Sequence, residues 1–291
     1  GGSSVYLSNF YWYPPSRVQA RLGAIAAARP GDVEPLLLGH TAQGRAITGV
    51  RLPATAPDRP RVVLTGTSQP SEGGQLACLW LLDYLLSEVS EVRALRKAFT
   101  FDVVPVTNPD GAALGTCMAN SQGENPFFDA AAAARGKPSS AESAALWRLV
   151  ATGSDGKDPP AAGYLEFHAY YQSDKPCGLY IVTPEAFSDP ARRATYLRTS
   201  AALTELSNRP GWSWWAPKQQ RQRYERNMRL LRDPSQGGGV QADSAFLLYP
   251  AAAQFGTASH LYKLHTMLTA REWRERAITV LIHYLNALGA E

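Results

Sequence analysis

The chain has little cysteine, no long apolar run and no strong excess of charge, and each absence excludes a class of protein. Three cysteines among 291 residues are too few for a disulfide framework, and their spacing fits no zinc finger. No apolar segment is long enough for a transmembrane helix, so we expect no membrane span. The net charge is only +4, with basic residues dispersed except near 218–232, which argues against a nucleic-acid partner.

Neither the cysteines nor the first residues identify the cellular compartment. Cys78 lies in an apolar helical run and is expected in the core, whereas Cys117 and Cys177 could form one disulfide or remain free thiols, which we favour. The opening Gly1-Gly2-Ser3-Ser4 is not a basic-then-apolar leader. We expect a trimmed or processed form, in which a leader was removed from a periplasmic or secreted protein. The sequence does not give the oligomeric state.

Helical and strand patterns alternate along the chain, which predicts an α/β fold with a mixed, mostly parallel sheet. Helices are expected at 14–29, 75–87, 141–151, 190–207, 217–232 and 269–288, and strands at 34–39, 46–52, 61–65, 99–106, 163–168, 178–183, 245–249 and 254–261. The connections 107–140 and 208–245 are longer than usual, and such long loops often carry function. There is no internal repeat and no long linker.

Two residues that could take part in chemistry follow predicted buried strands. Glu72 lies in a Gly-rich loop between a strand and a helix, and His168 ends the run Tyr164–His168. Ligand sites of α/β proteins lie at the carboxyl ends of strands. Taken singly, each residue has an ordinary structural explanation: an acid at a helix N-terminus for Glu72, and a structural histidine for His168.

Four segments in order make the combination more specific than either residue. Their sequences resemble the entry hairpin, the first ligand loop, the Asn-Pro-Asp-Gly turn and the third-ligand strand of zinc metallocarboxypeptidases: Gly39–Ile47, Leu64–Glu72, Pro105–Gly111 and Leu165–His168. The order and spacing agree over roughly residues 14–290. The resemblance implies a three-layer sandwich of the carboxypeptidase A type, with residues 5–291 in a single domain.

The resemblance also implies a zinc site with one changed ligand. Gln69 stands where the family has its first zinc histidine, and Glu72 and His168 stand at the other two ligand positions. An amide oxygen is a weaker zinc ligand than imidazole, although a minority branch of the family uses Gln here. We therefore predict Zn²⁺ held by Gln69, Glu72 and His168, with an open position for an activated water.

The chain departs from the family pattern in its substrate clamp and its general base. Met118 and Phe128 stand where arginines would bind a C-terminal carboxylate, so that bidentate recognition is lost. The family's basic Glu near the end of the last core strand has no carboxylate counterpart in Phe255–His260. Ser259 or His260 takes its place, and only His260 has a suitable pKa. Tyr249 is the candidate for the family's mobile tyrosine.

Aromatic and basic residues cluster late in the chain. Trp212, Trp214 and Trp215 precede a series of arginines between 221 and 232. They could line a cleft for an anionic or sugar-bearing substrate. The alternative, which we favour, is an exposed arginine-rich helix anchored by the tryptophans.

The favoured function is a divergent zinc hydrolase. It would cleave an amide bond in a peptide or amino-acid conjugate with metal-activated water. The alternative is a catalytically degenerate pseudoenzyme that binds a peptide or glycan, which the missing base and clamp favour. A third possibility is repurposed chemistry in the same cleft.

Overall fold

The structure is a computed structural model that describes residues 13–137, 139–170, 178–209, 212, 222, 225–229, 247–266 and 268–289. Its centre is one sheet of seven strands in the order β1-β2-β4-β3-β5-β7-β6. The strands are β1 (Glu34–His40), β2 (Ala46–Leu52), β3 (Arg61–Gly66), β4 (Thr100–Val104), β5 (Gly163–Tyr170), β6 (Gly178–Tyr180) and β7 (Ala258–His265). Among the helices of these residues, none is both long and apolar enough to cross a membrane.

The middle of the sheet is parallel and its margins are antiparallel. Strands β4, β3, β5 and β7 run parallel, while β1, β2 and β6 pair antiparallel to their neighbours. Every residue of β3 and of β7 is buried, as expected for strands covered on both faces. The predicted mixed, mostly parallel α/β sheet is therefore confirmed, and its parallel strands end at one common edge.

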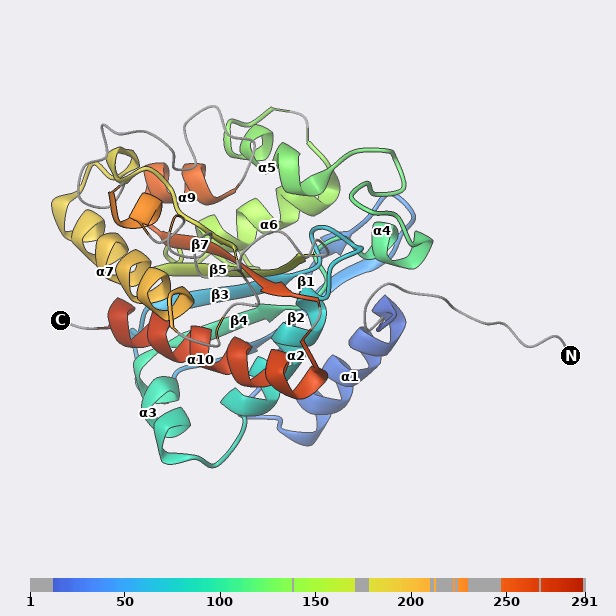
Figure 1. Cartoon of the computed structure of the whole chain (residues 1–291). Coiled ribbons are helices and arrows are strands. Elements are labelled where there is room, and N and C mark those ends of the chain that lie inside the picture. The colour runs from blue at the N-terminus through green and yellow to red at the C-terminus, as the bar shows by residue number, and fades with distance from the viewer. Residues whose placement is uncertain are drawn as a thin grey trace, which may run out of the picture.

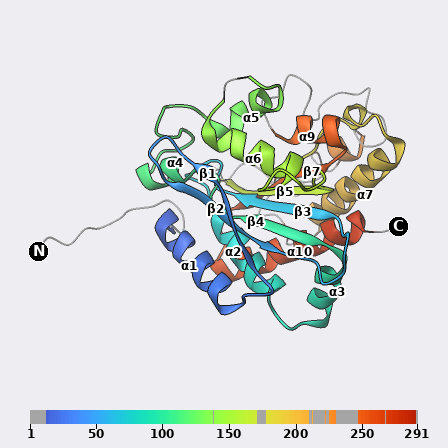
Figure 2. The ribbon, with the colours of Figure 1, turned by 180° about the vertical axis from the view of Figure 1, so that it is seen from behind.

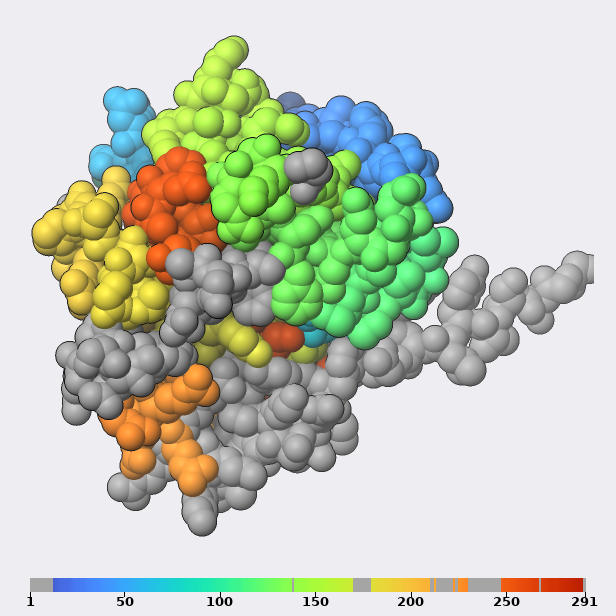
Figure 3. All heavy atoms as spheres, turned by 90° about the horizontal axis from the view of Figure 1, so that it is seen from above, coloured from blue at the N-terminus to red at the C-terminus, as the bar shows by residue number. Residues whose placement is uncertain are grey.

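Helices cover both faces of the sheet and make three layers (Figures 1 and 2). One layer contains α5 (Pro126–Ala134), α6 (Ala141–Thr152) and α9 (Leu248–Phe255). The opposite layer contains α1 (Pro15–Ala28), α2 (Gly74–Leu85), α3 (Ser90–Ala98) and α10 (Ala270–Leu288), with α7 (Pro190–Ser207) packed beside α10. Figure 3 views the first layer from outside, with α5 in green beside α9 in orange-red. The short α4 (Pro109–Leu114) and the 3₁₀ turn η1 (Pro184–Ala186) complete the described elements.

Most predicted elements lie within a few residues of their expected bounds. The clearest are the helices α7 and α10, because capping residues mark their starts: Asp189 accepts hydrogen bonds from the first turn of α7, and Thr269 and Glu272 form a capping box on α10. The sequence analysis did not predict α3, α4 or α5. The last two lie in the supposed loop 107–140, each with a proline in its first turn.

The region before the last strand was predicted wrongly. Residues 245–249 and 254–261 were expected as strands, but 248–255 form the helix α9, and the strand β7 runs from Ala258 to His265. The three alanines Ala251–Ala253 favour a helix, and Pro250 is tolerated in its first turn. The error matters because it ended the strand too early, four residues short of its true carboxyl end.

Close backbone packing fixes where β3 leads into α2. A Cβ on Gly66 would collide with the backbone of Gly74, and a Cβ on Gly74 would collide with the carbonyl of Phe167 on β5. Only glycine allows these approaches. As a result, the loop 67–73 is held directly over the carboxyl ends of β3 and β5.

Candidate functional site

The loop after β3 begins with a strained residue that turns the next side chains toward the sheet edge. Thr67 has a φ of +56°, which is unusual for a β-branched residue and costs on the order of 1–3 kcal/mol. Its hydroxyl compensates by donating to Gln75 Oε1 at 2.5 Å and accepting from the Gln75 backbone N–H at 3.0 Å. Ser68, Gln69 and Glu72 follow, and all three are buried.

The structure brings together the three predicted ligands. His168 Nδ1 lies 2.8 Å from Glu72 Oε2 and 3.3 Å from Gln69 Oε1. The backbone N–H of Ala169 also donates to Glu72 Oε2, at 2.8 Å. These contacts join the loop after β3 to the end of β5, as the strand-end argument expected, and the role of the three residues as metal ligands stays a prediction.

Lys263 on β7 is the residue that the sequence analysis missed. Its Nζ lies 2.8 Å from Glu72 Oε1 and 3.3 Å from Gln69 Oε1. In the parallel pairing of β5 and β7, Lys263 is the direct partner of His168, so the two side chains share one face. The folded strand continues past Leu261 to His265, which places Lys263 near its carboxyl end, where a site residue is expected.

A second carboxylate, Glu166, lies on the other side of His168. Its Oε1 is 2.8 Å from His168 Nε2 and accepts a hydrogen bond from Ser68 Oγ, while its Oε2 accepts from Tyr164 Oη at 2.8 Å. The imidazole is therefore held between two carboxylates, Glu72 on Nδ1 and Glu166 on Nε2. This fixes both the position and the orientation of the ring.

Burial and neighbouring charge act in opposite directions on these groups. Burial alone would raise the pKa of Glu72, but the positive charges of His168 and Lys263 lower it below its ordinary value. Burial alone would lower the pKa of His168, but the carboxylates of Glu72 and Glu166 raise it. The pKa of Glu166 is likewise lowered against burial, chiefly by His168. Neighbouring charge therefore outweighs burial and sets the direction of each of these pKa shifts.

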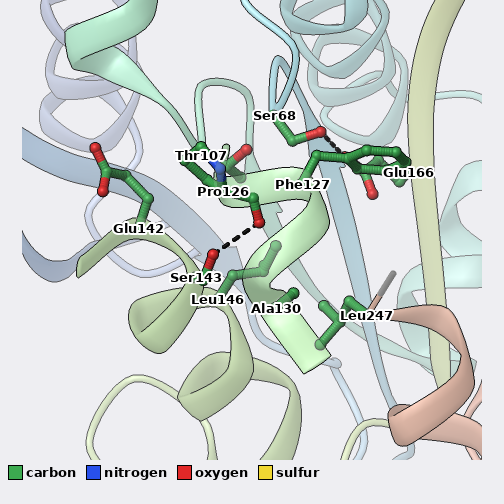
Figure 4. A pocket seen from close by; sticks show the side chains of 10 residues that line it. All are labelled: Ser68, Thr107, Pro126, Phe127, Ala130, Glu142, Ser143, Leu146, Glu166 and Leu247. Carbon is green, nitrogen blue, oxygen red and sulfur yellow. Dashed lines mark hydrogen bonds between the residues drawn. The ribbon is translucent and has the colours of Figure 1, made fainter. Parts of the chain in front are cut away.

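Apolar residues of α5 border the cluster. The Phe127 ring lies 5.0 Å from the His168 ring, and Phe128 packs edge-on against Phe127 at 5.2 Å. Ser68 and Glu166 close one end of a pocket that continues along Phe127 and Ala130 toward α6 (Figure 4). A group that binds beside His168 therefore meets an aromatic wall on this side.

His260, the predicted base, lies away from the cluster. Its Nε2 is 2.9 Å from Thr199 Oγ1 on α7, and its ring stacks on Tyr196 and meets the edge of Tyr284 on α10. It is three residues from Lys263 on the same strand, and side chains alternate between faces, so it points to the opposite face of the sheet. Burial also lowers its pKa to about 3. The expected place of the base is corrected accordingly, and Ser259 donates to the Leu248 carbonyl at 2.7 Å, also outside the cluster.

The other candidate residues have mixed outcomes. Tyr249 is half-buried on α9 and packs against the hydrophobic core, so its catalytic role stays a prediction. Met118 is half-buried and Phe128 is 41% exposed, in the segments where the clamp was expected. Trp212 donates from Nε1 to Tyr262 Oη at 2.8 Å, and the anchoring of an arginine-rich helix by the tryptophans stays a prediction. Residues 213–221, 223–224 and 230–246 lie outside the described part of the chain.

The structure describes two of the three cysteines. Cys78 is a buried free thiol within α2, as predicted for a core residue. Cys117 is an exposed free thiol beside Ser71. Cys177 lies outside the described residues.

The fold and the order of these motifs define a metallocarboxypeptidase-like protein, and comparisons with solved structures support the fold. A metallo-carboxypeptidase of Pseudomonas aeruginosa, in complex with (2-guanidinoethylmercapto)succinic acid, is similar with a TM-score of 0.70 and 18% identity. The match covers 96% of this chain and 71% of that one. A putative metallopeptidase of Shewanella denitrificans OS217 has a TM-score of 0.59 and 13% identity, covering 99% of this chain and 100% of the other.

Sequence comparison gives the family. The model for zinc carboxypeptidase matches residues 18–194, and this chain belongs to that family. Zinc carboxypeptidase A 1 of Anopheles gambiae is 39% identical over 98 residues, which are 33% of this chain and 22% of that protein. Cytosolic carboxypeptidase 3 of Mus musculus is 30% identical over 130 residues, 41% of this chain and 13% of the other. The match spans less than a quarter of the length of either relative.

The family implies zinc, but the residues at the cluster do not fit it. Both oxygens of Glu72, and also Gln69 Oε1, already contact protein donors, and His168 Nδ1 faces the Glu72 carboxylate. Zinc bound about 2 Å from Glu72 Oε1 would lie within roughly 5 Å of the ammonium. At an effective dielectric constant of about 20 their repulsion is on the order of 7 kcal/mol. In the described residues, no group of three or more His, Cys, Asp or Glu side chains is arranged to hold a metal.

Proposed function

We propose that this chain is a carboxypeptidase-fold protein that binds a peptide or amino-acid conjugate without hydrolysing it by zinc-activated water. The observation that carries the proposal is the Lys263–Glu72 ion pair, at 2.8 Å, in the middle of the predicted ligand set. An ammonium ion cannot accept a proton from water, so the residue at the carboxyl end of the last core strand cannot act as the family's basic Glu does.

The border of the cluster supports a peptide or conjugate as the bound molecule. Phe127 and Phe128 provide an aromatic surface beside His168, and Phe128 is 41% exposed. Ligand pockets are lined mostly by apolar and aromatic side chains, with a few polar groups that orient the bound molecule. Since Met118 and Phe128 replace guanidinium groups, a free C-terminal carboxylate is not the feature that is recognised there.

The test combines a hydrolysis assay with a binding assay. Protein supplemented with zinc chloride is incubated with blocked dipeptides and amino-acid amides, and released amino acids are measured by mass spectrometry. We expect no release above that of a His168→Ala variant. Calorimetric titration of the same compounds should show binding that differs by less than about threefold between free-acid and amidated forms, since a charge-assisted pair worth about 1.5–3 kcal/mol is missing.

Two results would contradict the proposal. One is turnover that requires His168. The other is a preference of more than about tenfold for the free carboxylate, which would indicate that another cation replaces the clamp. Asp155→Asn is the matched control, because Asp155 is an exposed loop residue paired only with Lys157 among its ion-pair contacts.

A second candidate is the zinc-dependent amide hydrolase, and one observation favours it. His168 Nε2 lies 2.8 Å from Glu166, and metal-binding histidines usually hold a carboxylate on the nitrogen that faces away from the metal. This candidate gains if purified protein contains about one zinc per chain that is lost in His168→Ala, and if the zinc-bound protein cleaves amides.

A further inference from the structure

The position of Lys263 on β7 determines where its ammonium group lies. The residue lies within β7, only 9% exposed, and pairs in register with His168 on β5. Its stem therefore runs between neighbouring buried side chains toward the edge of the sheet. There the ammonium meets Glu72 Oε1 at 2.8 Å and Gln69 Oε1 at 3.3 Å.

The same atoms would be the metal ligands in the family arrangement. Glu72 Oε1 and Gln69 Oε1 contact Lys263, and Glu72 Oε2 contacts His168 Nδ1 and the Ala169 N–H. The two oxygens and the imidazole nitrogen point toward one another, as ligands of one cation do. The ammonium group of Lys263 already lies among them.

We propose that Lys263 is a resident cation that takes the place of a metal ion. The native chain therefore excludes divalent metal, and removing the lysine charge opens a divalent-metal site formed by Gln69, Glu72 and His168. The inference rests on the proposed function in taking this cluster as the binding cleft, but it concerns the cation that organises the cleft and not the molecule bound there. Without the lysine ammonium, the Glu72 carboxylate and the Gln69 amide oxygen would lie buried beside the His168 imidazole. Such a donor set favours a hard or borderline cation.

The test measures zinc directly. Wild type, Lys263→Met, Lys263→Gln and Lys263→Arg are purified with a chelator, dialysed against zinc chloride and analysed for metal by mass spectrometry. We expect Lys263→Met and Lys263→Gln to bind about one zinc per chain, at least a hundredfold more tightly than wild type. Lys263→Arg keeps the charge and should behave as wild type. Adding His168→Ala to Lys263→Met should remove the zinc.

Each outcome supports or overturns the inference. Stoichiometric zinc in wild type that is lost in His168→Ala overturns it, as does a folded Lys263→Met or Lys263→Gln with no more zinc than wild type. If both variants are unfolded without metal, refolding in zinc chloride, followed by circular dichroism, supports the inference, and failure to refold overturns it. Wild type that binds zinc without hydrolysing peptides overturns only this inference, whereas turnover that requires His168 in wild type without bound zinc overturns only the proposed function.

Discussion

Replacing Lys263 with Met should destabilise the protein through Glu72. The two side chains are 11% and 8% exposed, and their charged atoms are 2.8 Å apart. At an effective dielectric constant of about 20, the attraction between unit charges at this distance is about 6 kcal/mol, and the cost of desolvating both groups offsets part of it. Removing one partner of such a buried pair leaves the other charge uncompensated and costs about 3–5 kcal/mol.

A double-mutant cycle separates this pair from general packing effects. Lys263→Met, Glu72→Gln and the double variant are unfolded with urea in the presence of a chelator, and tryptophan fluorescence follows the transition. The double variant should be less destabilised than the sum of the single variants by about 2–3 kcal/mol. The exposed pair Arg271–Glu275 serves as the control and should show no measurable coupling. Additivity of Lys263→Met and Glu72→Gln within about 0.5 kcal/mol would refute the argument that the pair organises the site.

Three further predictions concern buried residues outside the cluster. Burial lowers the pKa of His260 from 6.5 to about 3, so the unfolded chain takes up the proton first and the free energy of unfolding falls as pH drops below 6.5. His260→Phe should make the loss of stability between pH 6.5 and pH 4.5 smaller by about 2–3 kcal/mol in urea unfolding. An unchanged pH dependence would contradict the buried placement of His260. Gly74→Ala should cost roughly 3 kcal/mol or more, seen as a lower melting temperature, because its Cβ would collide with the Phe167 carbonyl. Asp102→Ala should cost about 3–5 kcal/mol in urea unfolding by removing the buried carboxylate that Arg51 and Arg61 share, and a loss no larger than that of Asp155→Ala would argue against this role.

Much of the site could be predicted because strand ends are local features of the sequence. Glu72 and His168 each follow an apolar, β-rich run, and the carboxyl ends of parallel strands meet at one edge. Gln69 was found by its position relative to Glu72 in a loop whose sequence resembles the family's. Apolar periodicity and capping residues likewise gave α7 and α10 nearly to the residue.

Lys263 and Glu166 could not be assigned in the same way, since their roles depend on registers that a single sequence does not display. The predicted strand ended at Leu261, so Lys263 fell outside it. His260 was preferred to Ser259 as the base because of its pKa, although it faces away from the cluster. Glu166 lies within the segment Leu165–His168, but only the folded chain shows that it contacts His168 Nε2 and Ser68 Oγ.

The sequence by itself determined the α/β class, the family and the three side chains that gather at the sheet edge, because these follow from apolar patterns, turn residues and motif order. Only the tertiary structure decided what charge lies among them. Electrostatic partners are set by distances of about 3 Å between segments nearly 200 positions apart, as between Glu72 and Lys263, and a one-residue change of strand register would reverse the face. For that reason the Lys263–Glu72 ion pair emerges from the folded chain and not from its motifs.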